Sequence, residues 1–397
     1  MKRRVFTTTL ALAAVLLSGP AWAQQEAQPA ALKGDDLSFV QKARNWLDQS
    51  KLVERLNGDV DGWYPKLGGM TTGSGMSLGP GYRAHLAGEN GVFIDLSTAI
   101  STKSYKTVDA RVRWFQAAND RLELWTDYRY QDFSQEDFFG FGNDTTLALR
   151  TDYALNSHDI TARGIVNAAP WLRLGMDLGY FIPTIGPGED RNYRSTDIVF
   201  SDREAPGLVQ QPSFLHSTAF AEIDYRDAKG NPRSGGYYYA GFGVWDDRTL
   251  NQYDHKRFQS EVSHFIPVAT KKHVIANRVG LIFVNNPPGE RVPFYLYPYV
   301  GGHNTVRGFK EFRFQDENAL WINTEYRYAA GKYTDLALFV DAGKVARNWQ
   351  DLGFGGMHTA YGFGVRFGTP KRTFARLDFG FGGGEGHQIY FKMGPSF

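Results

Sequence analysis

Residues 121–130 read Arg-Leu-Glu-Leu-Trp-Thr-Asp-Tyr-Arg-Tyr, and apolar and charged side chains alternate along them. In an extended chain, successive side chains point to opposite faces. One face of this segment would carry the apolar residues Leu122, Leu124, Tyr128 and Tyr130. The other would carry Glu123, Asp127 and Arg129. Period-two alternation predicts a strand with one face in apolar surroundings and one in polar surroundings.

The same alternation recurs in Val92–Ile100, Leu172–Leu178 and Leu377–Phe381. Around the last of these, Arg376 and Asp378 fall on the polar face. From Gly73 onward we predict about 16 strands, most of them about 10 to 14 residues long, enough to cross hydrocarbon at a tilt. They lie near 74–85, 91–101, 105–117, 121–133, 145–155, 157–168, 171–182, 214–227, 233–246, 254–267, 271–285, 317–330, 333–345, 357–368, 371–382 and 388–397. A soluble sandwich would also alternate, but strand length and the two chain termini favour a membrane barrel.

The lengths of the connections give a check on this strand count. In an outer-membrane barrel the connections after odd-numbered strands are extracellular and longer than the periplasmic turns. Residues 183–213 and 286–316 are long and follow the seventh and eleventh predicted strands. Residues 134–144 are also long but fall on the periplasmic side, so the count near them is open to error.

The N-terminus has the pattern of a signal peptide, residues 1–23. Basic residues at 2–4 precede an apolar stretch at 5–17, and Ala21-Trp22-Ala23 is a small-x-small cleavage site. A membrane anchor is the alternative, but the apolar stretch is short for a span. We therefore predict export. A leader, residues 24–72, follows with one helix near 35–57, and the barrel would occupy 73–397.

Composition points away from several other classes of protein. The chain has 397 residues, 15% aromatic residues, 44 Gly, no Cys and a net charge of +2. Apart from the N-terminus, no run of about 18 apolar residues could span a bilayer as a helix. Gly75–Gly79 fits the Gly-x-Ser-x-Gly string of hydrolases, but no helix is predicted after it. The His residues lack metal-binding spacing. We expect no enzyme activity, cofactor, metal or nucleic-acid partner.

Four segments together resemble the outer-membrane assembly-factor superfamily, the bacterial surface antigen barrels of the BamA and TamA types. They are Ile223–Asp227 with Asn231–Gly236, then Val306–Phe309, Asn323–Tyr328 and Phe339–Gly343. The first resembles the family's Asp-x-Arg…Pro-x-x-Gly hairpin, with Asp224, Arg226, Pro232 and Gly235 in the matching positions. The resemblance covers the barrel and omits the periplasmic POTRA modules. It implies an all-β, 16-stranded transmembrane outer-membrane β-barrel with an inward-folded extracellular loop.

In that family the Val-Arg-Gly-Phe/Tyr tip belongs to the inward-folded loop, which here is Val306, Arg307, Gly308 and Phe309. A guanidinium is costly inside a barrel unless a carboxylate meets it. Alternation places Glu325 and Asp341 on the lumen side of their strands. We predict that Arg307 pairs with Asp341, with Glu325 nearby. Gly308 would allow the turn, and Phe309 would pack against the wall. The alternative is an exposed turn with an unpaired arginine.

The terminal Phe397 looks like the signal by which outer-membrane barrels are recognised for insertion. The resemblance implies insertion or transport of protein or lipid at the outer membrane, through a weak seam between the first and last strands. A separate periplasmic partner would replace the POTRA modules. The helix at 35–57 is either a loose periplasmic helix or a functional one, which would serve as a docking site for that partner or as a lumen plug. A passive channel and a structural or surface-interaction barrel remain alternatives. Cargo and oligomeric state are left open.

Overall fold

The computed structural model describes residues 60–86, 91–117, 121–331, 333–394 and 397, except for the side chains of 115–117. The predicted signal peptide and the leader helix near 35–57 lie outside these residues. Within the described ranges, no helix combines the length and apolar character needed to cross a membrane.

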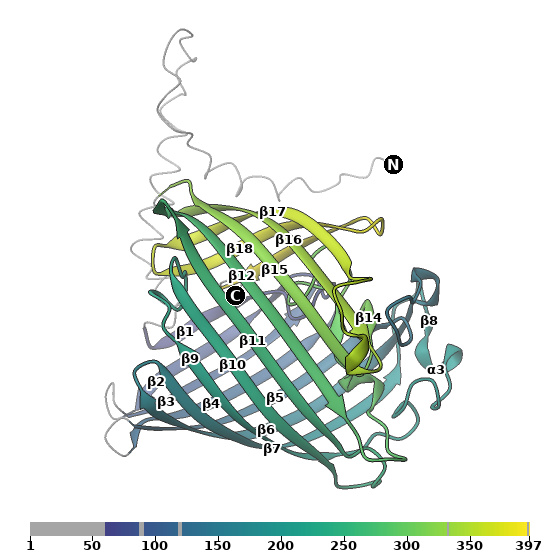
Figure 1. Ribbon diagram of the computed structural model, residues 1–397. Coiled ribbons are helices and arrows are strands. Elements are labelled where there is room, and N and C mark those ends of the chain that lie inside the picture. The colour runs from purple at the N-terminus through teal and green to yellow at the C-terminus, as the bar shows by residue number, and fades with distance from the viewer. Residues whose placement is uncertain (1–59, 87–90, 118–120, 332, 395–396) are drawn as a thin grey trace, which may run out of the picture. The chain divides into compact units, whose positions relative to one another are not determined.

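Sixteen strands form a single, nearly closed antiparallel barrel (Figure 1), so the predicted strand count is confirmed. They are β1 (Gly62–Gly68), β2 (Ser77–Leu86), β3 (Val92–Ser101), β4 (Lys106–Ala117), β5 (Leu122–Phe138), β6 (Thr151–Ala169), β7 (Leu172–Pro187), β9 (Phe214–Asp224), β10 (Gly235–Asp247), β11 (His255–Val268), β12 (Thr270–Asn285), β15 (Asn318–Ala329), β16 (Thr334–Ala346), β17 (His358–Thr369), β18 (Arg372–Gly382) and β19 (His387–Met393). Each pairs with the next barrel strand along the chain.

The remaining elements are short and lie in the long connections. They are β8 (Arg194–Ser195), α3 (Thr196–Val199), β13 (Tyr299–Val300), β14 (Phe314–Gln315) and the 3-10 turns η2 (Leu147–Leu149), η3 (Phe294–Leu296) and η4 (Trp349–Asp351). In Figure 1, β8, α3 and β14 lie at the same end of the barrel.

Two predicted strand boundaries are wrong. The sheet begins with β1, whereas the sequence predicts a first strand near 74–85. Glycine and proline interrupt the apolar alternation of this strand, so the sequence pattern does not reveal it. Pro65 has low strand propensity, but proline is tolerated at the edge of a sheet. The two strands predicted at 145–155 and 157–168 are one long strand, β6. The polar pair Asn156-Ser157 resembles a turn in sequence but lies in continuous ladders with β5 and β7.

These two corrections remove the exception at 134–144. The connection after β5 is residues 139–150, and β5 is now the fifth strand of the barrel. Residues 188–213, 286–317 and 347–357 follow the seventh, eleventh and thirteenth strands. These four connections, the longest in the barrel, therefore share one end, the long-loop end. The opposite end, the short-turn end, carries tight connections such as residues 170–171 and 370–371.

Burial follows the predicted alternation, as β16 shows. Leu336, Leu338 and Val340 are 45%, 61% and 57% exposed on the outer wall. Ala337, Phe339 and Asp341 alternate with them and are buried on the lumen side. The apolar face thus points outward and the polar face inward, which is the reverse of a soluble sandwich.

Candidate functional site: an ion-pair cluster that holds a loop in the lumen

Residues 301–313, here called the lumen loop, connect β13 to β14 and fold back inside the barrel. The amide of Gly302 donates to the carbonyl of Phe309 over 3.1 Å and closes the loop. Gly308 has a φ of +101°, and a Cβ there would lie 2.7 Å from the backbone nitrogen of Gly382 in β18. Only glycine fits this close approach to the wall without strain.

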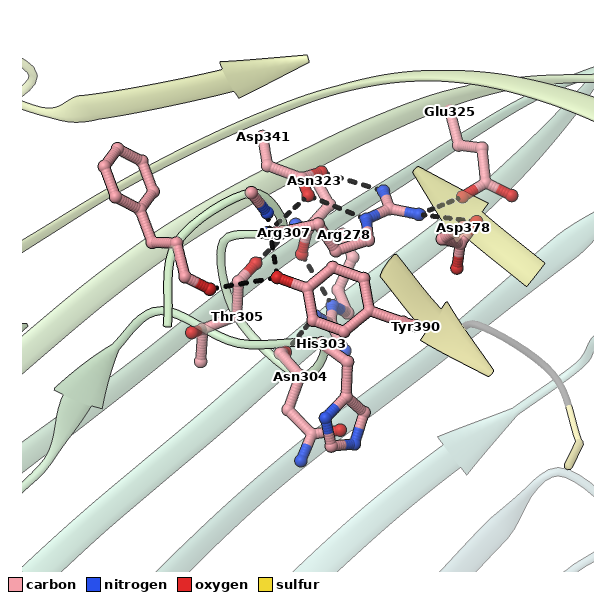
Figure 2. Close-up of polar contacts among 12 residues, drawn as sticks. Arg278, His303, Asn304, Thr305, Arg307, Asn323, Glu325, Asp341, Asp378 and Tyr390 are labelled. Carbon is pink, nitrogen blue, oxygen red and sulfur yellow. Dashed lines mark hydrogen bonds and ion pairs between the residues drawn. The ribbon is translucent and has the colours of Figure 1, made fainter. Parts of the chain in front are cut away.

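Arg307, in the lumen loop, makes a two-pronged contact with Asp341 of β16 (Figure 2). Its Nε and Nη2 donate to Oδ2 and Oδ1 over 2.7 and 2.8 Å, and its backbone amide adds a 3.0 Å bond to Oδ2. Nη1 donates to Glu325 of β15 over 2.8 Å. Arg307 is 2% exposed and both carboxylates are fully buried. Paired, planar contacts of this kind are among the strongest hydrogen bonds in proteins.

A wider cluster surrounds this pair, and the sequence analysis did not assign it. Glu325 also accepts from Arg327 Nε at 2.9 Å and from Arg366 Nη2 at 3.0 Å. Arg366 of β17 bonds to Asp378 of β18. The cluster holds four guanidinium groups, from Arg307, Arg327, Arg366 and Arg376, against the carboxylates of Glu325, Asp341 and Asp378. Alternation predicted that Arg376 and Asp378 face the polar side of β18, but not which strands they would meet.

Two aromatic residues of the barrel wall, Phe339 and Tyr390, contact the loop tip. The guanidinium of Arg307 lies 3.5 Å from the ring centroid of Phe339, a close cation–π contact. Tyr390 of β19 donates its hydroxyl to the carbonyl of Phe309 and accepts from the amide of Gly308, each over 2.9 Å. Phe309 itself is buried with its ring centroid 5.5 Å from that of Phe314. Tyr390 therefore ties the loop tip to the last strand, a role its position in the sequence does not reveal.

Asn323, from the third family segment, holds the base of the tip. Its side-chain amide donates to the carbonyl of Thr305 over 2.7 Å, and its oxygen accepts from Arg278 Nε over 2.9 Å (Figure 2). Both residues lie on the lumen side of adjacent strands, β15 and β12. The loop is thus bonded to the barrel wall along several strands.

The lumen loop also contacts the connection between β1 and β2. Glu311 accepts hydrogen bonds from the amide of Thr72 and from the hydroxyl of Tyr299, the latter over 3.0 Å. His303 Nδ1 lies 2.9 Å from Thr72 Oγ1. Burial raises the pKa of Glu311, but the His303 ring 3.7 Å away and the hydrogen bond from the Thr72 amide outweigh it and lower this pKa to about 2. Glu311 is therefore ionised at neutral pH.

The barrel seam lies beside these contacts. Among the described residues, no backbone pairing joins β1 to β19. Gly68 ends β1 close to Met393 at the end of β19, since a Cβ on Gly68 would lie 3.6 Å from Met393 Cγ. Lys392 Nζ donates to the carbonyl of Gly69 over 3.0 Å. In the described part of the chain, β1 and β19 are therefore joined by side-chain contacts and by the lumen loop, and not by backbone strand pairing. We call this boundary between the first and last strands the seam.

A second layer lies over the lumen loop at the long-loop end. Phe138, at the end of β5, packs with Tyr153 and Phe294 in a buried aromatic cluster. The amide of Gly142 donates to the carbonyl of Gln315 in β14 over 2.8 Å. The segment 138–142, for which the sequence offers no role, thus joins two long connections.

The hairpin segment lies at the short-turn end of the barrel, where Arg233 lines the same cavity as Arg366 of the ion-pair cluster. Arg226 donates two hydrogen bonds of 2.9 Å to Asp224. Gly235 has a φ of +95°, and a Cβ there would lie 2.3 Å from the carbonyl of Tyr225. Pro232 is buried within the turn. These residues shape the turn 225–234.

The C-terminal Phe397 stacks on Phe265 of β11, with 6.1 Å between the ring centroids.

The fold and the buried loop cluster define a class of protein, the outer-membrane β-barrels that carry an inward-folded loop. A family model for the Omp85 superfamily domain matches residues 102–397, and the chain belongs to this superfamily. Comparison with curated proteins finds no match.

Solved structures with the same fold include one BamA and two CdiB proteins. BamA from Haemophilus ducreyi lacking POTRA domains 1–3 is 14% identical with a TM-score of 0.59, over 94% of this chain and 80% of that one. CdiB from Escherichia coli is 11% identical with a TM-score of 0.55, over 83% of this chain and 61% of that one. CdiB from Acinetobacter baumannii is 12% identical with a TM-score of 0.51, over 84% and 58%. These likenesses concern the fold.

Proposed function

We propose that this chain assists the insertion or transport of protein, or of lipid, at the outer membrane, and that it acts with a separate periplasmic partner. The observation that carries the proposal is the lumen loop. It bonds to the last strand on one side of the seam and to the connection after the first strand on the other. Gly308 and Phe309 bond to Tyr390 of β19, while Glu311 bonds to Thr72 beside β1. The loop can therefore couple the state of the lumen to the state of the seam.

An unpaired strand edge is chemically suited to this role. A strand without a neighbour presents free N–H and C=O groups that pair readily with another chain. β1 and β19 have seven residues each, shorter than the other barrel strands, and β1 contains glycine and proline. Both features weaken strand pairing. The seam is thus where an incoming strand or a lipid would meet the least resistance.

A passive channel is less well supported. The Arg307 cluster and the lumen loop occupy the middle of the barrel, and the aromatic layer around Phe138 covers the long-loop end. In planar bilayers we expect low conductance from the intact chain. Deletion of 306–309 should raise it. High conductance from the intact chain would favour the channel.

The proposal is tested with vesicles of outer membrane from cells that make the chain, so that partners are present. The probe is a urea-denatured eight-stranded barrel, and its folding rate is followed by the gel shift on heating. The chain has no Cys, so Gly69→Cys with Lys392→Cys can be joined by a bis-maleimide across the seam. A control pair, Lys106→Cys with Asp132→Cys, joins neighbours in a continuous ladder.

We expect vesicles with the chain to accelerate folding of the probe. The seam cross-link should abolish this acceleration, and the control cross-link should leave it unchanged. An equal rate with and without the chain would reject the proposed function. A gain that survives the seam cross-link would reject the seam as the route.

A further inference from the structure

A basic cavity of about 430 Å³ opens at the short-turn end of the barrel. It lies between the turn 225–234 and the turns that join β11 to β12, β15 to β16 and β17 to β18. Five basic residues line it, namely Arg233, Lys271, Lys272, Arg366 and Lys371. We call it the rim cavity.

Two of these arginines are buried and have donors to spare. Arg233 is 9% exposed and Arg366 is 3% exposed. Arg233 Nη2 bonds to Asp335, but its Nη1 finds no partner within the described part of the chain. Arg366 Nε is also unpartnered there, although both of its Nη atoms are paired. Buried N–H groups are rarely left unpaired, because losing water without gaining a partner is costly. Both donors suit an anion.

The acidic residues of the cavity do not supply that anion. Asp335 is already bonded to Arg233 and, over 3.2 Å, to Asn231. Asp227 accepts from Lys271 Nζ and from the amide of Arg233, each over 2.8 Å. Arg366 is already paired with Glu325 and Asp378. The other four positive groups against these two carboxylates leave an excess of two positive charges. A phosphate group, with its several acceptor oxygens, matches this donor set.

An apolar groove of about 530 Å³ lies on the outer wall of the same strand ends. It is lined by His273, Tyr326, Tyr328, Leu336, Leu338 and Phe363. The two sites share their strands, since Lys272 precedes His273 and Asp335 precedes Leu336. Tyr326 donates its hydroxyl to His273 Nδ1, or accepts from it, over 2.7 Å. Tyrosines of this kind mark the boundary between hydrocarbon and headgroups.

We infer that this rim is a binding site for one anionic phospholipid, with its phosphate at the rim cavity and an acyl chain in the outer groove. The basic excess identifies the headgroup as anionic, and the groove beside it favours a lipid over free phosphate. Short turns face the periplasm in outer-membrane barrels, so the lipid would come from the periplasmic leaflet. The inference is independent of whether the chain handles protein.

The test measures binding to the full chain, purified in detergent, by native mass spectrometry. The probes are dihexanoyl phosphatidylglycerol, dihexanoyl phosphatidylcholine and inorganic phosphate. The rim variant K271A/K272A/K371A removes three exposed lysines of the cavity. The control K103A/K229A/K256A removes three exposed lysines that do not line it. The groove variant Y328A/L336A removes apolar contacts and no charge. The gel shift on heating confirms that each variant is folded.

We expect phosphatidylglycerol to bind more tightly than either other probe, and the rim variant to weaken it about 10-fold to 100-fold. The control should change it less than about 3-fold, and the groove variant should weaken the lipid but leave phosphate unchanged. Equal binding of phosphatidylcholine, equal binding of phosphate, or equal effects of the rim and control variants would each overturn the inference. So would a groove variant that binds the lipid as the wild type does.

Discussion

Arg307→Ala tests the ion-pair cluster most directly. Among the described residues, every hydrogen bond to Asp341 comes from Arg307, two from the guanidinium and one from the backbone amide. The substitution leaves a fully buried carboxylate with the amide alone. Removing one partner of a buried ion pair typically costs about 3–5 kcal/mol, because the remaining charge is desolvated without compensation. Glu325 keeps Arg327 and Arg366, so the loss falls mainly on Asp341.

The barrel can reduce this cost by releasing the lumen loop and hydrating Asp341. The assay therefore has two readouts, the free energy of unfolding in urea and trypsin cleavage after Lys310 or Arg313, both in the lumen loop. We expect a loss of about 3–5 kcal/mol if the loop stays in place. A smaller loss should come with faster cleavage. The double variant Arg307→Ala with Asp341→Asn should recover part of the loss, since it removes the unpaired charge.

The exposed pair Lys106–Asp132 gives a matched control. Its Nζ–Oδ2 distance is 2.7 Å, similar to that of Arg307–Asp341, but the lysine side chain is 54% exposed. Lys106→Ala should cost less than about 1 kcal/mol. If Arg307→Ala costs no more than this control, leaves loop cleavage unchanged and adds to Asp341→Asn without coupling, the reasoning is refuted.

Three further predictions concern the surroundings of the loop. Gly308→Ala should lower the free energy of unfolding in urea by about 1–3 kcal/mol, because of the positive φ at this position and the clash of a Cβ with β18. The control Gly331→Ala has open space around it and should change the same free energy by less than about 0.5 kcal/mol. Tyr390→Phe should cost about 1–3 kcal/mol by the same measurement, since it leaves two buried loop groups unpaired. The pKa of Glu311 is lowered from 4.5 to about 2, so its contribution is present above pH 4.5 and is lost as pH falls toward 2. Glu311→Gln should flatten this part of the stability profile, and an unchanged profile would contradict the assignment.

The sequence predicted the architecture because alternation depends on neighbouring residues only. It therefore placed Glu325 and Asp341 on the lumen face of their strands. It misread residues 145–168 because a polar pair inside a long strand looks like a turn. It missed β1 because glycine and proline interrupt the apolar pattern, and their place at the edge of the sheet is a tertiary fact.

The partners of the cluster were harder to predict for a physical reason. Arg366, Asp378 and Tyr390 lie on three successive strands, and their meeting at the loop depends on the stagger between strands. Stagger is a property of the closed barrel and leaves no local mark on the sequence. The family segments end before this region, so they gave no help there either.

The charges of the cluster bear on the release of the lumen loop that the proposed function would need. Without the loop, the wall contributes Arg327, Arg366 and Arg376 against Glu325, Asp341 and Asp378, three charges of each sign. The loop adds only Arg307 and leaves one excess positive charge when it is docked. Departure of the loop therefore returns the wall to neutrality, and water can replace the bonds that Asp341 loses. If the wall alone had more carboxylates than guanidinium groups, it would need the positive charge of Arg307, and release of the loop would leave buried carboxylates without a partner. The charge count is thus compatible with the release of the loop that the proposed function requires.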